Sequence, residues 1–388
     1  MADVVIAGVG QTQVGEHWDV SLRELAYKAV EAAQQDAGGL LPQALFVGNM
    51  LAPHLSRQAH LATLVADFVG LKGIEAITVE AAGASGGAAL RAGYMAVASG
   101  QVDVALVVGV EKITDQVGST VEAALTSSAD SDYEAVQGLT PTAQAALLMR
   151  RYLHEFDVPR SAFAGFSIVA HANGECNPLA MFQKAISLEA YNRAGIVSDP
   201  LNMFDVAPNA DGAAALVLTH PDLLPAHFAH PLVRIAGSSL ATDTLALHDR
   251  SDPLSFHAVQ LSVARACQKA RISPLQVDLF ELYDAYSIYA ALTLEAAGFA
   301  GRGQGWQLAQ DRQISRSGTL PTSTFGGLKA RGNPGGATGV YQAVEAVLQL
   351  RGQAGQNQVL GARRAMIQSL GGPASTAVTH ILEVMQGS

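Results

Sequence analysis

The 388-residue chain contains few of the residues from which disulfide frameworks, metal sites and nucleic-acid surfaces are built. It has only two cysteines, Cys176 and Cys267, which excludes a disulfide framework and is typical of a reducing cytoplasm. Neither cysteine belongs to a CxxC pair, and no group of His and Cys residues has metal-ligand spacing, so we expect no metal site. Lys and Arg number 24 against 34 Asp and Glu, and the net charge of −10 argues against nucleic-acid binding.

Long apolar runs are also absent. No uninterrupted apolar segment reaches the roughly 18 residues that a membrane-spanning helix needs. The N-terminal stretch carries an acidic residue, Asp3, and no basic region, so it does not resemble a secretory signal peptide. We therefore expect a cytoplasmic protein without a membrane span. Charged residues make up 15% of the chain and hydrophobic residues 49%, which predicts extensive burial and leaves room for a subunit interface.

The order of expected elements in the first half of the chain returns in the second. Each half begins with an apolar strand and a helix, and the first of these helices starts with a capping box formed by Ser21 and Glu24. A turn of small residues then opens another helix, which further apolar strands follow. The matching ranges are strands 4–10 and 232–236, turns and helices 83–100 and 333–352, strands 102–108 and 364–368, and strands 213–219 and 376–384, with helix 257–270 and strand 277–282 completing the second half.

This repetition predicts an α/β fold made of two duplicated halves, 1–225 and 226–388. We expect five strands of mixed direction in each half. The helices that begin near Ala84 and Gly335 are expected to stack antiparallel at the centre. The chain is too long for one small core, which fits such a pair of halves.

An insertion, at about 114–203, separates elements that the two halves share. It contains helical stretches, one of which begins at Thr140 and Pro141, a polar cap followed by the residue favoured at the first helical position. Long insertions on a regular scaffold either cover a ligand site or form an interface arm, and the sequence leaves both alternatives open.

Residues 78–89 form the most informative segment. They are expected to form a strand that runs into a turn of small residues and then opens a helix. The first turn of a helix presents unpaired backbone N–H groups and the positive end of the helix dipole, which lower the pKa of a thiol or stabilise an oxyanion. The position suited to a reactive cysteine is occupied by Gly83, so we expect the scaffold for thiolate chemistry without the thiol.

Four segments carry motifs that can be compared with a known family. They are Val79–Gly87, Asp211–Ala215, Glu281–Tyr286 and Gly326–Gly339. Together they resemble the thiolase superfamily, in particular its archaeal and sterol-carrier-protein branch, over essentially the whole chain. The resemblance implies a thiolase fold, with two duplicated halves packed as a five-layer α-β-α-β-α sandwich. It also implies an acyltransferase family of lipid metabolism, an acyl-CoA ligand (a coenzyme A thioester as substrate, with no cofactor), and at least a homodimer.

The resemblance further implies that the usual catalytic groups of this family have been replaced. Gly83 stands at the position of the nucleophilic cysteine, and Asn333 stands in a Gly-Asn-Pro turn where thiolases have the histidine that activates it. Tyr283 and Asp284 replace a His-Asp pair that helps to build an oxyanion hole, and Ser369 replaces a second cysteine. Because glycine has no nucleophile and a neutral Asn accepts no proton, we expect no two-step Claisen exchange through these residues.

Substrate-binding positions are implied in the same way. They are Arg331, Gly332, Gly335, Gly371 and His171. Arg331 and its neighbour Lys329 would meet the phosphates of coenzyme A, although exposed, solvated charge is the more common outcome for such residues. The alternative role for His171 is a structural hydrogen bond, for Asp284 a helix N-cap at the same turn, and for Tyr286 aromatic packing.

Three functional hypotheses remain open at this point. The first is carbon–carbon bond cleavage, a retro-aldol reaction of a β-hydroxyacyl-CoA. In it Tyr283, Asp284 or Tyr286 supplies a base or proton relay, while Asn333 and backbone N–H groups bind the oxyanion. The second is a non-catalytic subunit of an acyl-CoA enzyme complex, assembled with a partner such as a small OB-fold companion protein. The third is a thiolase whose cysteine at position 83 has been engineered to glycine.

Overall fold

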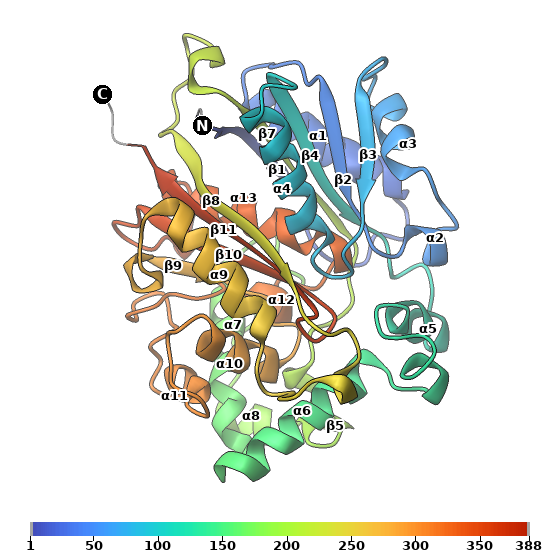
Figure 1. Ribbon diagram of the computed structural model, residues 1–388, viewed down its shortest axis with the longest axis vertical. Helices are drawn as coiled ribbons and strands as arrows, with labels where there is room; N and C mark the ends of the chain where they lie inside the picture. Colours follow the sequence, from blue (N-terminus) through green and yellow to red (C-terminus); the bar gives the residue numbers. More distant parts are fainter. Residues whose placement is uncertain (1–2, 386–388) are drawn as a thin grey trace.

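The computed structural model describes residues 3–385 and places nine strands of this part of the chain in one sheet (Figure 1). The order across the sheet is β3-β2-β4-β7-β1-β8-β11-β10-β9, with first-half strands on one side and second-half strands on the other. The strands are β1 (Val5–Gln11), β2 (Ala44–Gly48), β3 (Glu75–Val79), β4 (Val104–Glu111), β7 (Gly212–Thr219), β8 (Val233–Thr242), β9 (Leu279–Glu281), β10 (Arg364–Gly371) and β11 (Thr376–Val384). The apolar segments predicted as strands in the two halves are confirmed.

The pairing of the strands repeats from one half to the other. In the first half β1 pairs antiparallel with β7, β7 antiparallel with β4, and β4 parallel with β2. In the second half β8, β11, β10 and β9 follow the same scheme, which confirms the predicted duplication. The halves are joined at one register pair, Val5 with Arg234, and the boundary that we propose at 225/226 falls between β7 and β8.

The prediction of five strands in each half is wrong for the second half of the described chain. In the first half β3 is the fifth strand and pairs parallel with β2. Its counterpart in the second half is reduced to an isolated bridge between Phe280 and Thr322. Ser323, the next residue, has φ +49°, and this left-handed conformation ends the extended run.

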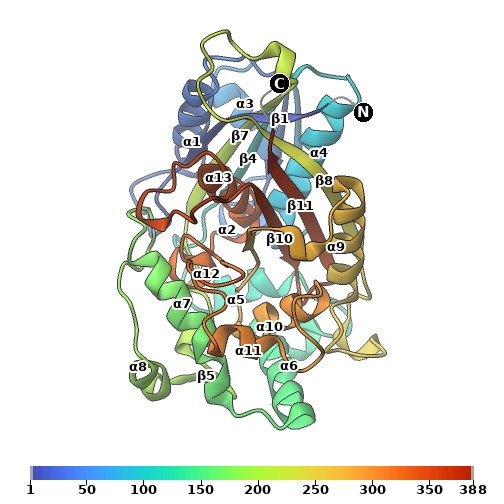
Figure 2. The ribbon, with the colours of Figure 1, turned by 90° about the vertical axis from the view of Figure 1, so that its left-hand side faces the viewer.

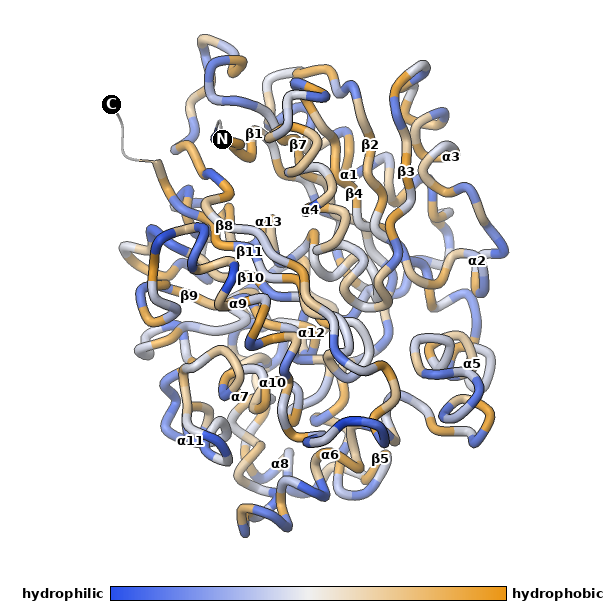
Figure 3. The backbone as a smooth tube through the Cα atoms, in the orientation of Figure 1, coloured by the Kyte–Doolittle hydropathy of each residue, from blue (hydrophilic) through white to orange (hydrophobic). Residues whose placement is uncertain are grey.

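Helices cover both faces of each half (Figure 2). Within residues 3–385, two helices pack on the outer face of the first-half strands and one on the outer face of the second-half strands, while two lie between the halves. This arrangement confirms the five-layer sandwich. These helices are α1 (Leu22–Asp36) and α3 (Leu61–Phe68), then α9 (His257–Ala270), and in the centre α4 (Ser85–Ala98) and α13 (Thr338–Leu350). The predicted capping box of α1 is present, with Ser21 N donating to Glu24 Oε2 at 2.8 Å. Figure 3 shows apolar residues along strands such as β4 and polar residues at the periphery, for example around α11 (Gly305–Gln310).

The two central helices meet at their N-terminal turns, where only glycine fits. A Cβ added at Gly86 would lie 2.9 Å from both the carbonyl oxygen of Gly336 and the amide nitrogen of Val340. A Cβ added at Gly339 would overlap the backbone of Gly87 in the same way. The predicted central helix pair is therefore present, and close backbone contact brings two positive helix ends to one place.

The insertion forms a helical layer at one end of the molecule, together with helices from the second half (Figures 1 and 2). Its predicted helix is confirmed, because Thr140 Oγ1 accepts a hydrogen bond from Ala143 N at 3.2 Å. The insertion contains α5 (Ser119–Thr126), α6 (Pro141–Phe156), α7 (Ala164–Gly174), α8 (Leu188–Arg193), β5 (Ile196–Ser198) and β6 (Leu201–Asn202); around it lie α2 (Ala52–Leu55), α10 (Ser287–Ala296), α11 and α12 (Gly327–Ala330). No helix within residues 3–385 is both long enough and apolar enough to cross a bilayer.

Asp211, at the start of β7, anchors the first residues of the insertion. Its carboxylate accepts hydrogen bonds from Ile113 N at 2.7 Å, Thr114 N at 2.9 Å and Thr114 Oγ1 at 2.7 Å. His17 N donates to the same carboxylate from a third segment, and Lys112 Nζ donates to it from the residue before Ile113. Burial alone raises the pKa of Asp211, but these hydrogen bonds outweigh it and hold the pKa below its ordinary value.

Replacing Asp211 with Asn should lower the free energy of unfolding by roughly 3 kcal/mol at pH 7, because an amide N–H would face donors that need an acceptor. The lowered pKa means that the carboxylate stabilises the fold fully above its ordinary value of 3.8 and loses this effect as the pH falls through the folded value. Urea unfolding from pH 7 down to pH 3 should show the difference from wild type narrowing below about pH 4. Asp222→Asn, at an exposed position, serves as the control, and a gap that does not narrow would contradict this account.

Candidate active site

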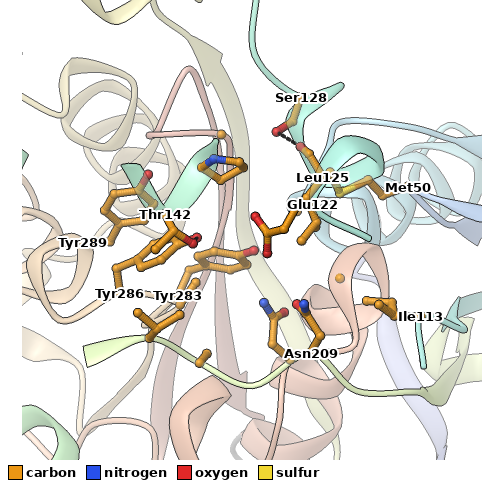
Figure 4. A pocket seen from close by; sticks show the side chains of 18 residues that line it. Met50, Ile113, Glu122, Leu125, Ser128, Thr142, Asn209, Tyr283, Tyr286 and Tyr289 are labelled. Atoms are coloured by element: carbon orange, nitrogen blue, oxygen red, sulfur yellow. Dashed lines mark hydrogen bonds between the residues drawn. The ribbon is translucent and has the colours of Figure 1, made fainter. Parts of the chain in front are cut away.

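A cavity of about 90 Å³ lies where the N-terminal turns of the central helices meet the insertion (Figure 4). Its walls come from both halves and from the insertion, so the insertion covers a pocket rather than standing apart from it. The lining residues are Met50, Gly83, Ile113, Glu122, Leu125, Ser128, Pro141, Thr142, Val206, Ala207, Asn209, Tyr283, Ala285, Tyr286, Tyr289, Asn333, Gly335 and Gly372. The cavity thus brings together three residues predicted as catalytic, Gly83, Tyr283 and Asn333.

Gly83 lies at the wall of the cavity, directly against the side chain of Tyr283. A Cβ added at Gly83 would overlap the Tyr283 hydroxyl and would lie 2.7 Å from the carbonyl oxygen of Leu370. The space that a cysteine side chain would need is therefore filled by the phenol of Tyr283. Cys176 and Cys267 are both free, and neither belongs to the lining, so no thiol of the described residues faces the cavity.

Asn333 lines the same cavity as Tyr283 and lies close enough to its hydroxyl to affect the pKa of the phenol. Thr338 Oγ1 lies 3.3 Å from Asn333 Oδ1 and donates to it, which leaves the amide N–H of Asn333 to face the phenol. Burial raises the pKa of Tyr283 well above its usual range, and the hydrogen bond from Asn333 partly opposes this rise. Backbone hydrogen bonds to Pro208 and Ala210 fix the turn that carries Asn333.

Two further tyrosines extend the same wall. The rings of Tyr286 and Tyr289 meet edge to face with centroids 4.9 Å apart. The hydroxyl of Tyr286 lies 3.1 Å from Thr142 Oγ1 on α6, so this side chain reaches across to the insertion as well as packing. Burial raises the pKa of Tyr286 to about 12 and that of Tyr289 well above 10.

Glu122 and Asn209 are lining residues that sequence reasoning missed. Glu122 lies on α5, and its carboxylate points toward the tyrosine wall in Figure 4. Burial raises its pKa. Asn209 forms an isolated backbone bridge with Asn333 and thereby lies next to it. The only signal for Glu122 was its place in a predicted ligand-covering insertion, since no motif surrounds it.

Arg331 and Lys329 are buried, contrary to the expectation of exposed, solvated charge. Arg331 Nη1 donates to Glu345 Oε2 at 2.8 Å, and its guanidinium lies 5.0 Å from the ring centroid of Tyr341. Lys329 Nζ donates to the carbonyl oxygen of Asp205 at 2.8 Å. Both side chains are occupied inside the protein and neither lines the cavity, because the segment that carries them packs under α7.

Asp284 and Ser369 also lie outside the lining. Asp284 Oδ1 accepts a hydrogen bond from Leu328 N at 2.8 Å, so it caps the first turn of α12 and not α10, the helix that follows its own turn. Ser369 Oγ donates to Gln342 Oε1 at 2.9 Å on α13. The structure therefore places both side chains in contacts that hold neighbouring segments together.

The remaining residues that were predicted to bind substrate differ in whether they line the cavity. Gly335 lines the cavity, whereas Gly332, Gly371 and His171 do not. Gly332 has φ +108°, a conformation that L side chains rarely adopt. This backbone conformation is enough to explain why the residue is glycine, and no role in ligand binding is needed. His171 Nδ1 lies 3.3 Å from the carbonyl oxygen of Lys184, and burial lowers the pKa of the ring. This contact matches the structural alternative considered for His171.

Comparison with known proteins gives two family matches that together span most of the chain. Residues 4–222 match the model described as thiolase, N-terminal domain, and residues 239–384 match the thiolase C-terminal domain-like model. An acetyl-CoA acetyltransferase of Methanothermobacter thermautotrophicus is 41% identical over 98% of this chain and 99% of its own length. The benzoylsuccinyl-CoA thiolase subunit BbsB of Thauera aromatica is 30% identical over 92% of this chain and 91% of its own length.

A solved structure shares the fold. The Ltp2-ChsH2(DUF35) aldolase superposes with a TM-score of 0.83 at 24% identity, and the match covers 98% of both chains. At this identity the likeness concerns the fold alone. The predicted thiolase fold is confirmed by this match and by the two family models.

Gly83→Ala should lower the free energy of unfolding by about 1–3 kcal/mol, because the new methyl group overlaps the Tyr283 hydroxyl and the Leu370 carbonyl. In the Tyr283→Ala background the phenol is gone. There Gly83→Ala should lower the free energy of unfolding by at least about 1 kcal/mol less than it does in the wild-type background. Urea unfolding of the four proteins in this double-mutant cycle measures the coupling. Equal costs in both backgrounds would show that Tyr283 does not fill the space beside residue 83.

Proposed function

The chain belongs to the thiolase family, and from that premise we propose that it binds a coenzyme A thioester beside Gly83 and acts on it without an acyl-enzyme intermediate. Enzymes of this family use coenzyme A thioesters as substrates and need no metal or organic cofactor. The observation that carries the proposal is the phenol of Tyr283, which stands where the side chain of a nucleophile would have to be. A site so filled favours chemistry on the thioester enolate over covalent transfer.

The reaction that we propose is the retro-aldol cleavage of a β-hydroxyacyl-CoA. Removal of the β-hydroxyl proton turns the β-carbon into a carbonyl, and the electron pair of the Cα–Cβ bond passes to the α-carbon as a thioester enolate. The amide N–H of Asn333 and the adjoining helix N-termini are donors suited to the enolate oxygen. Protonation at the α-carbon then releases a shortened acyl-CoA and an aldehyde or ketone.

The hypothesis of a thiolase with one engineered substitution has less support. In that case a cysteine at position 83 would have to fit the site as it stands, yet its Cβ would overlap the Tyr283 hydroxyl. The glycine and the tyrosine are complementary in shape. This match in shape favours a site whose chemistry uses both residues together.

A non-catalytic subunit is our second candidate function. One relative is itself called a thiolase subunit, and the structural neighbour is an aldolase whose name includes a DUF35 protein. By analogy, a small OB-fold companion protein would hold part of the coenzyme A while this chain supplies the acyl pocket. We also propose a cytoplasmic location, from the low cysteine content.

We further propose that two copies pair through strand β3. This strand is the edge of the sheet in the first half, and Ile77 at its middle is 51% exposed. An unpaired edge with an exposed apolar side chain is a template for pairing with another strand. A twofold dimer pairs identical edges, which makes a second copy of this chain the natural partner.

Incubation with a β-hydroxyacyl-CoA should release an aldehyde or ketone together with a shortened acyl-CoA, detected by liquid chromatography. Free coenzyme A should not be needed, in contrast to thiolysis, because no acyl group is transferred. Tyr283→Phe should lower kcat by about 100-fold or more, since it removes the hydroxyl group next to the reacting atoms and keeps the ring. Failure to release product, with or without a companion protein, would reject the lyase and leave the subunit hypothesis.

Ile77 is exposed in the single chain and would be covered in the dimer. Ile77→Asp should therefore convert the dimer to a monomer, because two carboxylates of like charge would face each other across the paired edges. Light scattering after size-exclusion chromatography measures the mass in solution. Leu275→Asp, at another exposed apolar residue far along the chain, provides the control and should leave the mass unchanged. A wild-type protein that elutes as a monomer would reject pairing through β3.

A further inference from the structure

Among the described residues, one side chain that lines the cavity can act as a Brønsted base, and it comes from the insertion. We propose that Glu122 accepts the proton of the substrate β-hydroxyl and is the contact by which the site recognises a hydroxylated acyl group. This inference rests on the proposed function, because it assigns the base for the same cleavage. It goes beyond the resemblance, which assigns no role to residue 122.

Elimination among the lining residues leads to Glu122. The lining contains no Lys, Arg, His or Cys of the described residues, and its titratable side chains are Glu122 and the three tyrosines. Burial holds the pKa of each tyrosine above its usual value, so at neutral pH these phenols keep their protons and can only relay them. Asn209 and Asn333 are neutral amides, which donate hydrogen bonds but take up no proton.

The position of Glu122 suits this task. It lies on α5, with its carboxylate directed into the cavity toward the tyrosine wall (Figure 4). The negative charge of Glu122 acts across the cavity on Tyr286, where it adds to the rise in pKa that burial causes. Among residues 3–385 no cation pairs with Glu122; Lys112, at the base of the insertion, is bound to Asp115 and Asp211 instead.

The neighbouring residues keep α5 in place over the cavity. Leu125, one turn after Glu122, also lines it, and Ser128 Oγ donates to the Leu125 carbonyl oxygen at 2.8 Å. The apolar side of α5 packs into a small cluster with Leu51 and Ile113. Ile113 is in turn held by Asp211, so the helix that carries Glu122 is tied to the central sheet.

The proton and electron balance closes without a co-reactant. Glu122 takes the hydroxyl proton, the oxygen forms a carbonyl, and the Cα–Cβ bond breaks with its electron pair going to the α-carbon. The proton on Glu122 then passes to the α-carbon, directly or through the Tyr283 hydroxyl. The carboxylate returns to its starting state, and the products are a carbonyl compound and a shortened acyl-CoA.

Recognition and turnover can be tested separately with the intact protein. Calorimetric titration with 3-hydroxybutyryl-CoA and with butyryl-CoA measures how strongly the site prefers the hydroxyl. A hydrogen bond to a charged acceptor predicts about a tenfold or greater preference in wild type, and Glu122→Ala should abolish it. Glu122→Gln keeps an acceptor oxygen but takes up no proton, so it should retain part of the preference while kcat falls by about 100-fold or more.

The control is Glu189→Gln, an exposed carboxylate on α8 of the same insertion, which should change neither quantity. Circular dichroism and thermal unfolding verify that each variant is folded. An unchanged preference in Glu122→Ala, or an unchanged kcat in Glu122→Gln, would overturn the role of Glu122 while the lyase function stands. A hydroxyl preference that depends on Glu122 without any cleavage would support the recognition role and reject the lyase.

Discussion

The backbone contact between the N-terminal turns of α4 and α13 is the constraint on which the rest of the structure depends. Only glycine at Gly86 and Gly339 allows this approach, and the approach brings the two halves into one sandwich. It also aims two helix N-termini at one small volume, where their N–H groups favour negative charge. The cavity lies beside this point, so the packing that joins the halves also creates the electrostatic environment of the site.

In the cavity, the side chain that fills the space next to the N-terminal turn of α4 determines which reactions the site can support. Here the space belongs to the phenol of Tyr283, supported by Asn333, and residue 83 has no side chain to compete for it. A phenol with a raised pKa donates and relays protons but does not carry an acyl group. A family scaffold for covalent transfer thus holds a set of groups suited to proton movement, with Glu122 as the basic member.

Much of the fold was predictable because it rests on patterns that repeat along the chain. Apolar strands, the Ser21 capping box and the small-residue turns at the central helices each carry a local signal that the structure bears out. The failures were non-local. The burial of Arg331 depends on Glu345 on another helix, and the loss of a fifth strand in the second half depends on a left-handed residue, Ser323, which the sequence pattern does not mark. Glu122 was missed for the same reason, since a single acidic residue in an insertion gains meaning only when the chain folds over the cavity.

The unequal number of strands in the two halves has a consequence for assembly. One border of the sheet, β3, has free backbone groups, whereas the opposite border is the three-residue β9, whose Phe280 already bonds to Pro321 and Ser323. Growth by joining sheets can therefore take place at one border only. When two molecules pair through β3, each covers the free backbone groups of the other. The joined sheet then has no free edge at which a third molecule could add, so it cannot lengthen into a fibre.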